Sequence, residues 1–360
     1  MTATFYRRPL PKNAISFSGP EGKTLFAEAL AAGDLEGYFP LAEQFHTQAE
    51  PTFCGLGSLV VALNALAIDP GRLWKGPWRW FGEELLDCCV PLERVRSKGL
   101  DLDELACLAR CNGAEVTLAR AGASDLESFR HALKRAARAE AVFVASYDRS
   151  VLGQTGSGHF SPIGGYHRAR DLALILDVAR FKYPPHWVSA ELLFEAMRSI
   201  DPDSGKSRGW LVLRPRAHGL SVGFSIKCDG HSWRDLVDDV AKALGRLEAS
   251  GDVDGIVRAV APLASYLELR TPTTDAHREA IESARAALRA LPLYARVSAS
   301  FTPEQAELVA ILLLASVDLL DGSNRTAIDG LVGRLDEETP LAVELENVRA
   351  QIAALRAHVA

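Results

Sequence analysis

The spacing of hydrophobic residues changes character near residue 141. Between Leu56 and Leu63, leucine and valine recur at i, i+3, i+4 and i+7, the period of an amphipathic helix, and an Asp-Pro-Gly turn at 69–71 ends the run. The same period predicts helices over 23–32, 54–68, 80–89, 102–111, 126–139 and 190–198. Short apolar runs predict strands over 142–147, 159–167, 172–179 and 209–213. Helices followed by a mostly antiparallel sheet indicate the α+β class.

Beyond the last predicted strand, the sequence has the pattern of amphipathic helices. Ser232 begins one of them, Thr302-Pro303 with Gln305 forms a capping box, and Thr339-Pro340 begins the last helix. Because 360 residues are many for one domain, we predict two. They are an α+β domain over 1–220 and an all-helical C-terminal domain over 221–360.

Cys54 stands at the start of a predicted helix, six residues after Gln48. Unpaired backbone N–H groups and the helix dipole favour an anion at that position, which lowers a thiol pKa from about 8.5 toward neutrality. Cys54 is therefore a candidate nucleophile, and Gln48 is a candidate oxyanion donor beside the Cys54 N–H. The alternative for Cys54 is a small buried core residue, which is what most free cysteines are.

His159 and Asp177 supply the remaining groups of a thiol-based catalytic site. His159 lies between the glycine-rich segment 153–158 and an apolar run, so it begins a predicted strand. Asp177 interrupts an otherwise apolar strand, and a buried carboxylate needs a partner such as an imidazole. The glycine-rich segment could also be interpreted as a phosphate loop, but it lacks the Gly-Lys-Ser/Thr ending of that motif.

Several longer segments resemble those of one known family. They include Gly-His-Phe-Ser-Pro-Ile-Gly-Gly-Tyr at 158–166, and the others lie at 48–58, 63–66, 68–72, 74–80, 86–89 and 174–187. The resemblance is to phytochelatin synthase, the glutathione γ-glutamylcysteinyltransferase family, and it extends over about residues 4–216. It implies a papain-like cysteine-peptidase fold, with a helical lobe and an antiparallel sheet lobe, in the first domain.

The resemblance assigns a role to each candidate residue. It implies that Cys54 is the nucleophile, His159 the base and acid, Asp177 its orienting carboxylate and Gln48 the oxyanion donor. It also implies that the γ-glutamyl head group of the substrate is bound by an acid and an arginine. An Asp with an Arg suits that group, which carries an ammonium and a carboxylate on one carbon. The substrate-binding residues expected on this basis are Gly158, Phe160, Asp201 and Arg208.

The sequence leaves open the roles of Asp201 and Arg208 and the position of the acceptor pocket. Asp201 lies in Asp-Pro-Asp-Ser-Gly, which is turn chemistry in itself, so a solvated turn is the alternative for Asp201 and Arg208. The acceptor pocket is expected near Arg180, Lys182 and Tyr183, but the sequence does not define it.

The implied activity is ping-pong acyl transfer from glutathione to a second glutathione or to a growing phytochelatin peptide. No organic cofactor is expected, and a heavy-metal ion such as cadmium or zinc is expected to act as an activator in the form of a glutathione thiolate complex. A glutathione hydrolase, in which water is the acceptor, is one alternative. A non-catalytic, thiol-rich metal-binding protein is another, which the complete set of catalytic residue types disfavours.

The composition of the chain limits the classes of binding partner that we expect. The net charge of −6 disfavours an electrostatic nucleic-acid binder, so the aromatic and basic stretch 74–81 is expected to be buried packing rather than a base-stacking surface. No secretory signal follows the N-terminal arginines, and the longest apolar run, 308–320, is shorter than a bilayer span of about 20 residues and contains Asp318. We therefore expect a cytoplasmic protein that does not bind membranes.

The six cysteines raise the question of a protein metal site. A soft-metal thiolate site is conceivable from Cys88, Cys89, Cys107 and Cys111. The zinc-ribbon Cys-x2-Cys spacing is absent, which favours buried core cysteines. Cys228 is the only cysteine after 111, whereas plant members of the family carry many in this region. The C-terminal part is accordingly expected to be a helical cap or an oligomerisation surface, for instance in a homodimer.

Overall fold

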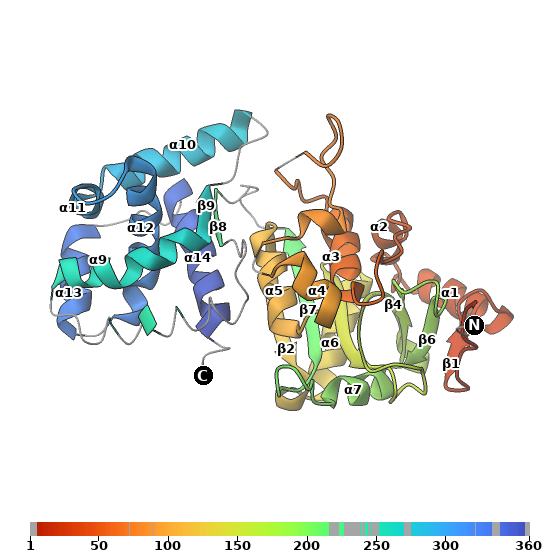
Figure 1. Ribbon diagram of the computed structural model, residues 1–360. Helices are drawn as coiled ribbons and strands as arrows, with labels where there is room; N and C mark the ends of the chain where they lie inside the picture. Colours follow the sequence, from red (N-terminus) through yellow and green to blue (C-terminus); the bar gives the residue numbers. More distant parts are fainter. Residues whose placement is uncertain are drawn as a thin grey trace, which may run out of the picture.

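The protein is represented by a computed structural model. The structure describes residues 6–71, 73–88, 90–215, 223–226, 252–269, 275–320, 322–332 and 339–356, together with Asp239, Lys242, Ala243 and Arg246. The described residues up to 215 and the described residues from 223 onward lie side by side as two bodies of packed elements (Figure 1). The predicted helix after Ser232 falls mostly outside the described residues, as do Cys89 and Cys228.

A seven-stranded sheet organises the N-terminal part. Its order is β1-β6-β5-β4-β3-β7-β2, and every neighbouring pair is antiparallel. The strands are β1 (Ala14–Ser16), β2 (Ala114–Arg120), β3 (Val142–Asp148), β4 (Gly158–His167), β5 (Leu172–Ile175), β6 (His186–Ser189) and β7 (Gly209–Pro215). The predicted α+β class and antiparallel sheet are confirmed.

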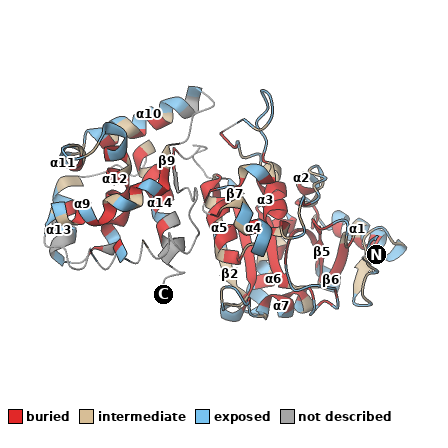
Figure 2. Ribbon diagram, viewed as in Figure 1, coloured by how far each residue is buried: buried red, intermediate tan, exposed pale blue. Residues whose placement is uncertain are grey.

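Helices cover both faces of this sheet. They are α1 (Pro20–Ala31), α2 (Tyr38–Ala42), α3 (Cys54–Ala65), α4 (Leu92–Lys98), α5 (Leu102–Cys111), α6 (Leu126–Ala137) and α7 (Ala190–Arg198). Alternate side chains of β3 enter different cores: Val142 and Val144 pack with α3 and α5, whereas Phe143 and Ala145 pack with α6 and α7. Figure 2 shows α3, α5 and the sheet as largely buried.

Two predicted elements differ from the structure. The predicted helix over 80–89 is wrong, since over the described residues 80–88 only one 3-10 turn forms, at Glu83–Leu85. The reason is tertiary: the Asn64 side chain holds the backbone N–H and C=O of Phe81, at 3.1 and 3.0 Å, and thereby diverts the chain from a helical path. The predicted strand over 172–179 ends early, at Ile175.

The aromatic stretch 74–81 is buried only in part. Phe81 is 1% exposed and lies in the core, but Trp78 is 71% and Trp80 is 44% exposed. The expectation of buried packing is therefore wrong for these two tryptophans. They belong to the loop that projects beyond α3 in Figure 1, where Trp74 donates to Glu84 and carries the Lys75 ammonium over its ring.

The described residues beyond 222 form their own apolar core. Their helices are α9 (Val253–Val260), α10 (Asp275–Arg289), α11 (Pro292–Ser298), α12 (Pro303–Ser316), α13 (Gly322–Val332) and α14 (Pro340–Arg356). The predicted capping box of Thr302 with Gln305 and the helix start at Pro340 are both confirmed. The expectation that every element here is helical is wrong, because β9 (Leu267–Leu269) pairs with β8 (Phe224–Ile226).

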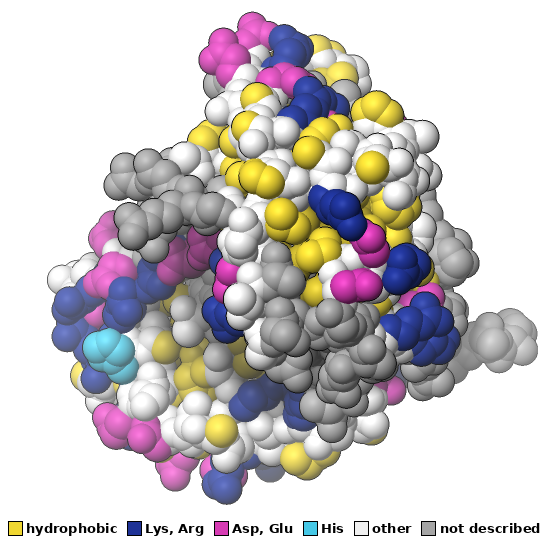
Figure 3. All heavy atoms as spheres, turned by 90° about the vertical axis from the view of Figure 1, so that its left-hand side faces the viewer, with side chains coloured by type: hydrophobic (Ala, Val, Ile, Leu, Met, Phe, Trp, Pro, Cys, Tyr) yellow, Lys and Arg dark blue, Asp and Glu magenta, His cyan; other side chains and the backbone are white. Residues whose placement is uncertain are grey.

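Helix α14 joins the two bodies. On one side it holds β8, because Glu344 accepts from the N–H groups of Gly223 and Phe224, at 2.7 and 3.0 Å. On the other side it lies against α5. On the face that the C-terminal part presents in Figure 3, Lys and Arg are interspersed with Asp and Glu and with apolar side chains. Within the described ranges, no helix combines the length and the hydropathy that crossing a bilayer requires.

Candidate active site

Cys54 is the first residue of α3 and lines a cleft of 360 Å³. Residues 55–63 of this helix are all buried, so α3 runs through the core and its N-terminus opens at the cleft. Burial opposes ionisation of the thiol. The neighbouring His159, the Phe160 backbone and Arg149 outweigh it, and they hold the pKa of Cys54 below its ordinary value. The local structure therefore favours a thiolate, as the sequence predicts.

His159 lies on β4, between Cys54 and a buried carboxylate. Its Nε2 is 2.9 Å from Oδ1 of Asp177, which leaves Nδ1 as the ring nitrogen that serves the Cys54 thiol. Burial alone would lower the pKa of His159, but the charge of Asp177 outweighs it and raises that pKa. The pair thus favours a thiolate next to an imidazolium, the reactive state of a cysteine nucleophile.

Asp177 follows β5 in a turn and is 1% exposed. Although burial disfavours its charge, the adjacent His159 and Arg149 keep the pKa of Asp177 well below its usual range. Its Oδ1 also accepts from the Ala179 N–H at 2.9 Å, which fixes the carboxylate relative to its own turn. Asp177 is therefore an ionised group in a fixed orientation, suited to hold the His159 ring.

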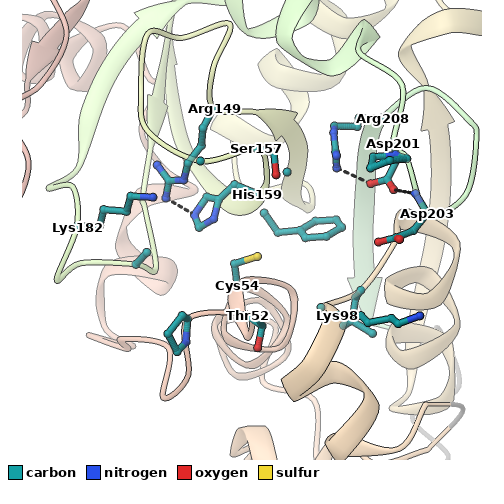
Figure 4. Close-up of a pocket in the computed structure, with 18 of the residues that line it drawn as sticks. Thr52, Cys54, Lys98, Arg149, Ser157, His159, Lys182, Asp201, Asp203 and Arg208 are labelled. Atoms are coloured by element: carbon teal, nitrogen blue, oxygen red, sulfur yellow. Dashed lines mark hydrogen bonds and ion pairs between the residues drawn. The ribbon is translucent and has the colours of Figure 1, made fainter. Parts of the chain in front are cut away.

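Arg149 completes this charged cluster and was not found from the sequence. Its Nη2 donates to both carboxylate oxygens of Asp177, at 2.7 and 3.0 Å, and lies 2.7 Å from His159 Nε2. Figure 4 shows the guanidinium reaching the imidazole from the side of the cleft opposite Arg208. Arg149 follows β3 in a polar turn, and no local pattern distinguishes it from the other basic residues of the chain.

The opposite end of the cleft holds Asp201 and Arg208. Arg208 Nη1 is 2.5 Å from Asp201 Oδ2, and both residues are more than nine-tenths buried. Arg208 Nε is buried without a partner in the structure. Asp201 also accepts from the Asp203 N–H at 3.0 Å. The two residues therefore form a buried ion pair beside Cys54 rather than the solvated turn that was the alternative (Figure 4).

Gly158 and Phe160 flank His159 on β4 and line the same cleft. A side chain at Gly158 would meet the Arg208 guanidinium, since a Cβ there would lie 2.5 Å from Arg208 Nη1. Glycine at this position is thus what lets Arg208 approach the catalytic strand. Phe160 is 2% exposed and belongs to the core beneath α3, with its backbone next to the Cys54 thiol.

Gln48 does not point its donors at the cleft in this structure. The residue is buried, and its Nε2 donates to the backbone carbonyls of Glu50 and Pro51, at 2.7 and 3.0 Å. Its Oε1 is buried without a hydrogen-bond partner. The expected role as an oxyanion donor stays a prediction, and it requires the amide to leave these carbonyls when substrate is bound.

The three residues expected at the acceptor pocket separate in the structure. Lys182 lines the catalytic cleft, donates to the Thr155 carbonyl at 2.6 Å, and has a pKa lowered by burial and by Arg149. Arg180 instead donates to the Phe45 carbonyl and lines a second, more apolar pocket. Tyr183 is buried, accepts from the Thr155 N–H at 2.9 Å, and carries the Arg149 guanidinium 5.1 Å from its ring centre.

Three of the four candidate metal-binding cysteines lie in the core. Cys88, Cys107 and Cys111 are buried among the apolar residues of α3, α5 and the sheet, and Cys88 accepts from Asn112. Among the described residues, no group of three or more His, Cys, Asp or Glu side chains is arranged to hold a metal ion. Cys89 lies outside the described residues, so the four-cysteine site stays a prediction.

Comparison with known proteins decides the family of this site. The model of the family described as phytochelatin synthase matches residues 5–210, which include every cleft residue discussed above. The chain belongs to the phytochelatin synthase family. The predicted resemblance is thereby confirmed.

Individual relatives agree with this family assignment. The chain is 50% identical over 260 residues to glutathione γ-glutamylcysteinyltransferase 1 of Arabidopsis thaliana. This match covers 72% of the present chain and 54% of the relative. It is 47% identical over 267 residues to the enzyme of the same name from Triticum aestivum, and this match covers 74% of the present chain and 53% of the relative. It is 41% identical over 258 residues to the Schizosaccharomyces pombe glutathione γ-glutamylcysteinyltransferase, and this match covers 71% of the present chain and 62% of the relative. The matched region of this phytochelatin synthase family member thus spans 53–62% of the length of these relatives.

Proposed function

We propose that the protein is a γ-glutamylcysteine dipeptidyl transferase that acts on glutathione through an acyl-enzyme on Cys54. The observation that carries this proposal is one cleft lined by Cys54 and His159, with Asp177 buried behind the imidazole and the buried Asp201–Arg208 pair at one end. The relatives named glutathione γ-glutamylcysteinyltransferase support the choice of substrate. The proposed activity is that of the family as a whole.

The proposed fold is papain-like for residues 1–220, followed by a C-terminal domain over 221–360. Its support is the placement of the nucleophile at the start of a buried helix and of the histidine on the facing antiparallel sheet. This arrangement brings a thiol and an imidazole together from two separate layers. The separate apolar core of the described residues beyond 222 supports the division into domains.

In the first half-reaction, the Cys54 thiolate attacks the carbonyl carbon of the Cys–Gly bond of glutathione. The backbone N–H at the start of α3 stabilises the resulting oxyanion, because the first N–H groups of a helix have no intrahelical partner. The His159 imidazolium then donates its proton to the departing glycine amine as the C–N bond breaks. The products are free glycine and a γ-glutamylcysteinyl thioester on Cys54.

In the second half-reaction, the α-amine of a second glutathione or of a phytochelatin peptide attacks the thioester. Neutral His159 removes the amine proton, a new amide bond forms, and the Cys54 thiolate leaves. Lys182 and Arg149 line the cleft on the side away from Arg208, so we assign that side to the acceptor. Their positive charges suit the carboxylate groups that an acceptor peptide carries.

The Asp201–Arg208 pair is proposed to bind the γ-glutamyl head group of the donor. Arg208 Nε, which has no partner in the structure, and the guanidinium nitrogen that is not paired with Asp201 suit the α-carboxylate of the donor. The Asp201 carboxylate suits the α-ammonium. Gly158 leaves room for this contact next to His159. The donor would thus lie along the cleft with its Cys–Gly carbonyl above Cys54.

A heavy-metal ion such as cadmium or zinc is proposed to enter as part of the substrate. The thiolate of glutathione is a soft ligand that binds these ions well, so the acceptor or donor can arrive as a metal thiolate. Because the reaction needs a reduced thiol at Cys54, we place the enzyme in the cytoplasm. Homodimerisation stays a prediction.

Hydrolysis of the same acyl-enzyme is the alternative function. It differs only in the acceptor, and the open acceptor side of the cleft admits water as well as peptide. Mass spectrometry of the products from glutathione, with and without cadmium, decides between the two. Transfer predicts free glycine together with (γ-Glu-Cys)n-Gly chains of n = 2 or more, whereas free γ-Glu-Cys as the dominant product under both conditions would contradict the transferase proposal.

A further inference from the structure

A chain of buried polar side chains leads away from Arg149 on the side opposite the catalytic pair. Arg149 Nη1 donates to Oε1 of Gln154, and Gln154 Nε2 lies 2.8 Å from Nε2 of His186. His186 Nδ1 in turn lies 2.8 Å from the Pro184 carbonyl oxygen. Arg149, Gln154 and His186 are 2%, 5% and 0% exposed, so these contacts are shielded from water.

The direction of each hydrogen bond in this chain follows from its two ends. A carbonyl oxygen only accepts, so His186 Nδ1 carries a proton and donates to Pro184. In the neutral ring Nε2 is then the acceptor for the Gln154 amide, whose oxygen is thereby turned toward Arg149. Since a guanidinium only donates, each donor in the series from Arg149 Nη1 through Gln154 and His186 to Pro184 faces an acceptor. The pattern holds only while His186 is neutral.

The environment of His186 favours its neutral form. Burial lowers its pKa, and the nearby Arg149 and His159 act in the same direction against Asp177 and the Pro184 carbonyl. Asp177, Arg149 and His159 are thus charged or titratable groups that act on the ring, which lies at the start of β6 between β5 and β1. The segment that carries Gln154 is also fixed, because its backbone N–H donates to the Arg149 carbonyl and the next residue is held by Tyr183.

We propose that Gln154 and His186 are positioning residues that hold the Arg149 guanidinium against His159 and Asp177 and thereby set the protonation states of Cys54 and His159. Without the Gln154 carbonyl, Nη1 of Arg149 loses its partner, and the guanidinium is held only through the contacts of Nη2 with Asp177 and His159 and by packing on Tyr183. It can then rotate away from its position beside His159 toward the cleft that it lines. Its fixed positive charge favours the thiolate at Cys54 and disfavours the imidazolium at His159. Loss of that charge raises both apparent pKa values, which shifts the reactive range to higher pH.

The inference rests on the proposed roles of Cys54 and His159, but its test needs no glutathione. The rate of Cys54 alkylation by iodoacetamide is measured against pH, with the modified cysteine identified by peptide mass spectrometry. For Gln154→Leu we expect the apparent pKa of the alkylation profile to rise by about one unit, the size typical of losing a nearby opposite charge. Gln44→Leu, a half-buried glutamine that donates to the Pro40 carbonyl, is the matched control and should leave the profile unchanged.

A pair of variants at His186 separates positioning from general structural support. His186→Leu removes the acceptor for Gln154 and should shift the profile upward, whereas the side-chain oxygen of His186→Gln can accept from the same amide and should restore it. An unshifted profile for folded Gln154→Leu and His186→Leu would overturn the inference. An equal shift for His186→Gln and His186→Leu would also overturn it. Failure of Cys54 to react faster than the buried cysteines in the wild-type protein would instead contradict the proposed nucleophile.

Discussion

At the residue scale, the site combines groups that the sequence reveals with groups that it does not. Cys54 and His159 were predictable because a helix start and a strand start leave patterns in the sequence. Asp177 was predictable because a carboxylate in an apolar run needs a partner. Arg149 was not, since its partners lie 10 and 28 positions away in the chain and nothing in its own turn indicates them.

The Asp201–Arg208 pair allows a prediction about substrate recognition. Arg208→Ala should lower kcat/KM for glutathione about tenfold to a hundredfold, since hydrogen bonds to charged groups contribute about 1.5–3 kcal/mol. For a Cys–Gly peptide that lacks the γ-glutamyl group, the loss should be small. Glycine release with both donors provides the measurement.

Arg198→Ala is the control for this substitution. Arg198 lies on α7 and is 57% exposed, in an ion pair with Glu195. Its replacement should affect neither donor. An equal loss of activity toward both donors in Arg208→Ala would assign Arg208 to structural support of the cleft instead.

At the element scale, helices with clear ends were predictable, and elements defined by distant contacts were not. The predicted bounds of α5 and α7 agree with the structure because polar N-caps, Asp101 and Ser189, precede their apolar periods. The short strands β1 and β6 and the half-exposed edge strand β2 were missed, since their apolar signal is weak. The predicted helix over 80–89 failed because Asn64, outside that segment, holds its backbone.

The start of α5 gives a prediction about pH and stability. Glu104 caps the helix by accepting from the Asp101 N–H at 2.9 Å, yet it is 1% exposed, and burial together with Asp101 raises its pKa to about 7 despite Arg94. The folded protein thus retains a proton that the unfolded chain loses above about pH 4.3. The free energy of unfolding should therefore fall by about 3 kcal/mol between pH 4.5 and 7.5.

Glu104→Gln should flatten this pH dependence, because an amide does not titrate. Urea unfolding of the variant and of the wild type at several pH values provides the measurement. Glu93→Gln on the neighbouring helix α4 is the control, since Glu93 is 82% exposed, and it should retain the wild-type slope. Parallel slopes for wild type and Glu104→Gln would show that Glu104 is already ionised in the folded state at low pH.

At the scale of the whole molecule, the chemistry and the C-terminal part are separate but in contact. All the cleft residues lie between Pro51 and Arg208, whereas α14 reaches the first body through α5. Nearly every residue of α5 is buried, which one neighbouring layer alone would not achieve for a helix. The C-terminal part therefore covers a face of α5 that would otherwise be exposed.

A chain that ends after Pro215 tests this division. It should still release one glycine per enzyme in a burst from glutathione, because the proposed catalytic and head-group residues are all retained. Its thermal midpoint should be lower, since the apolar face of α5 becomes exposed to water. If circular dichroism shows a folded protein that gives no glycine burst, the C-terminal part contributes directly to the site.

The acyl-enzyme is the central claim, and trapping it is the most direct test. The protein is incubated with glutathione, quenched in acid after a few seconds, digested and analysed by mass spectrometry. We expect a γ-glutamylcysteinyl group on the peptide that contains Cys54, and we expect Cys54→Ser to show neither the adduct nor glycine release. An adduct on another cysteine, or wild-type glycine release by Cys54→Ser, would contradict the account.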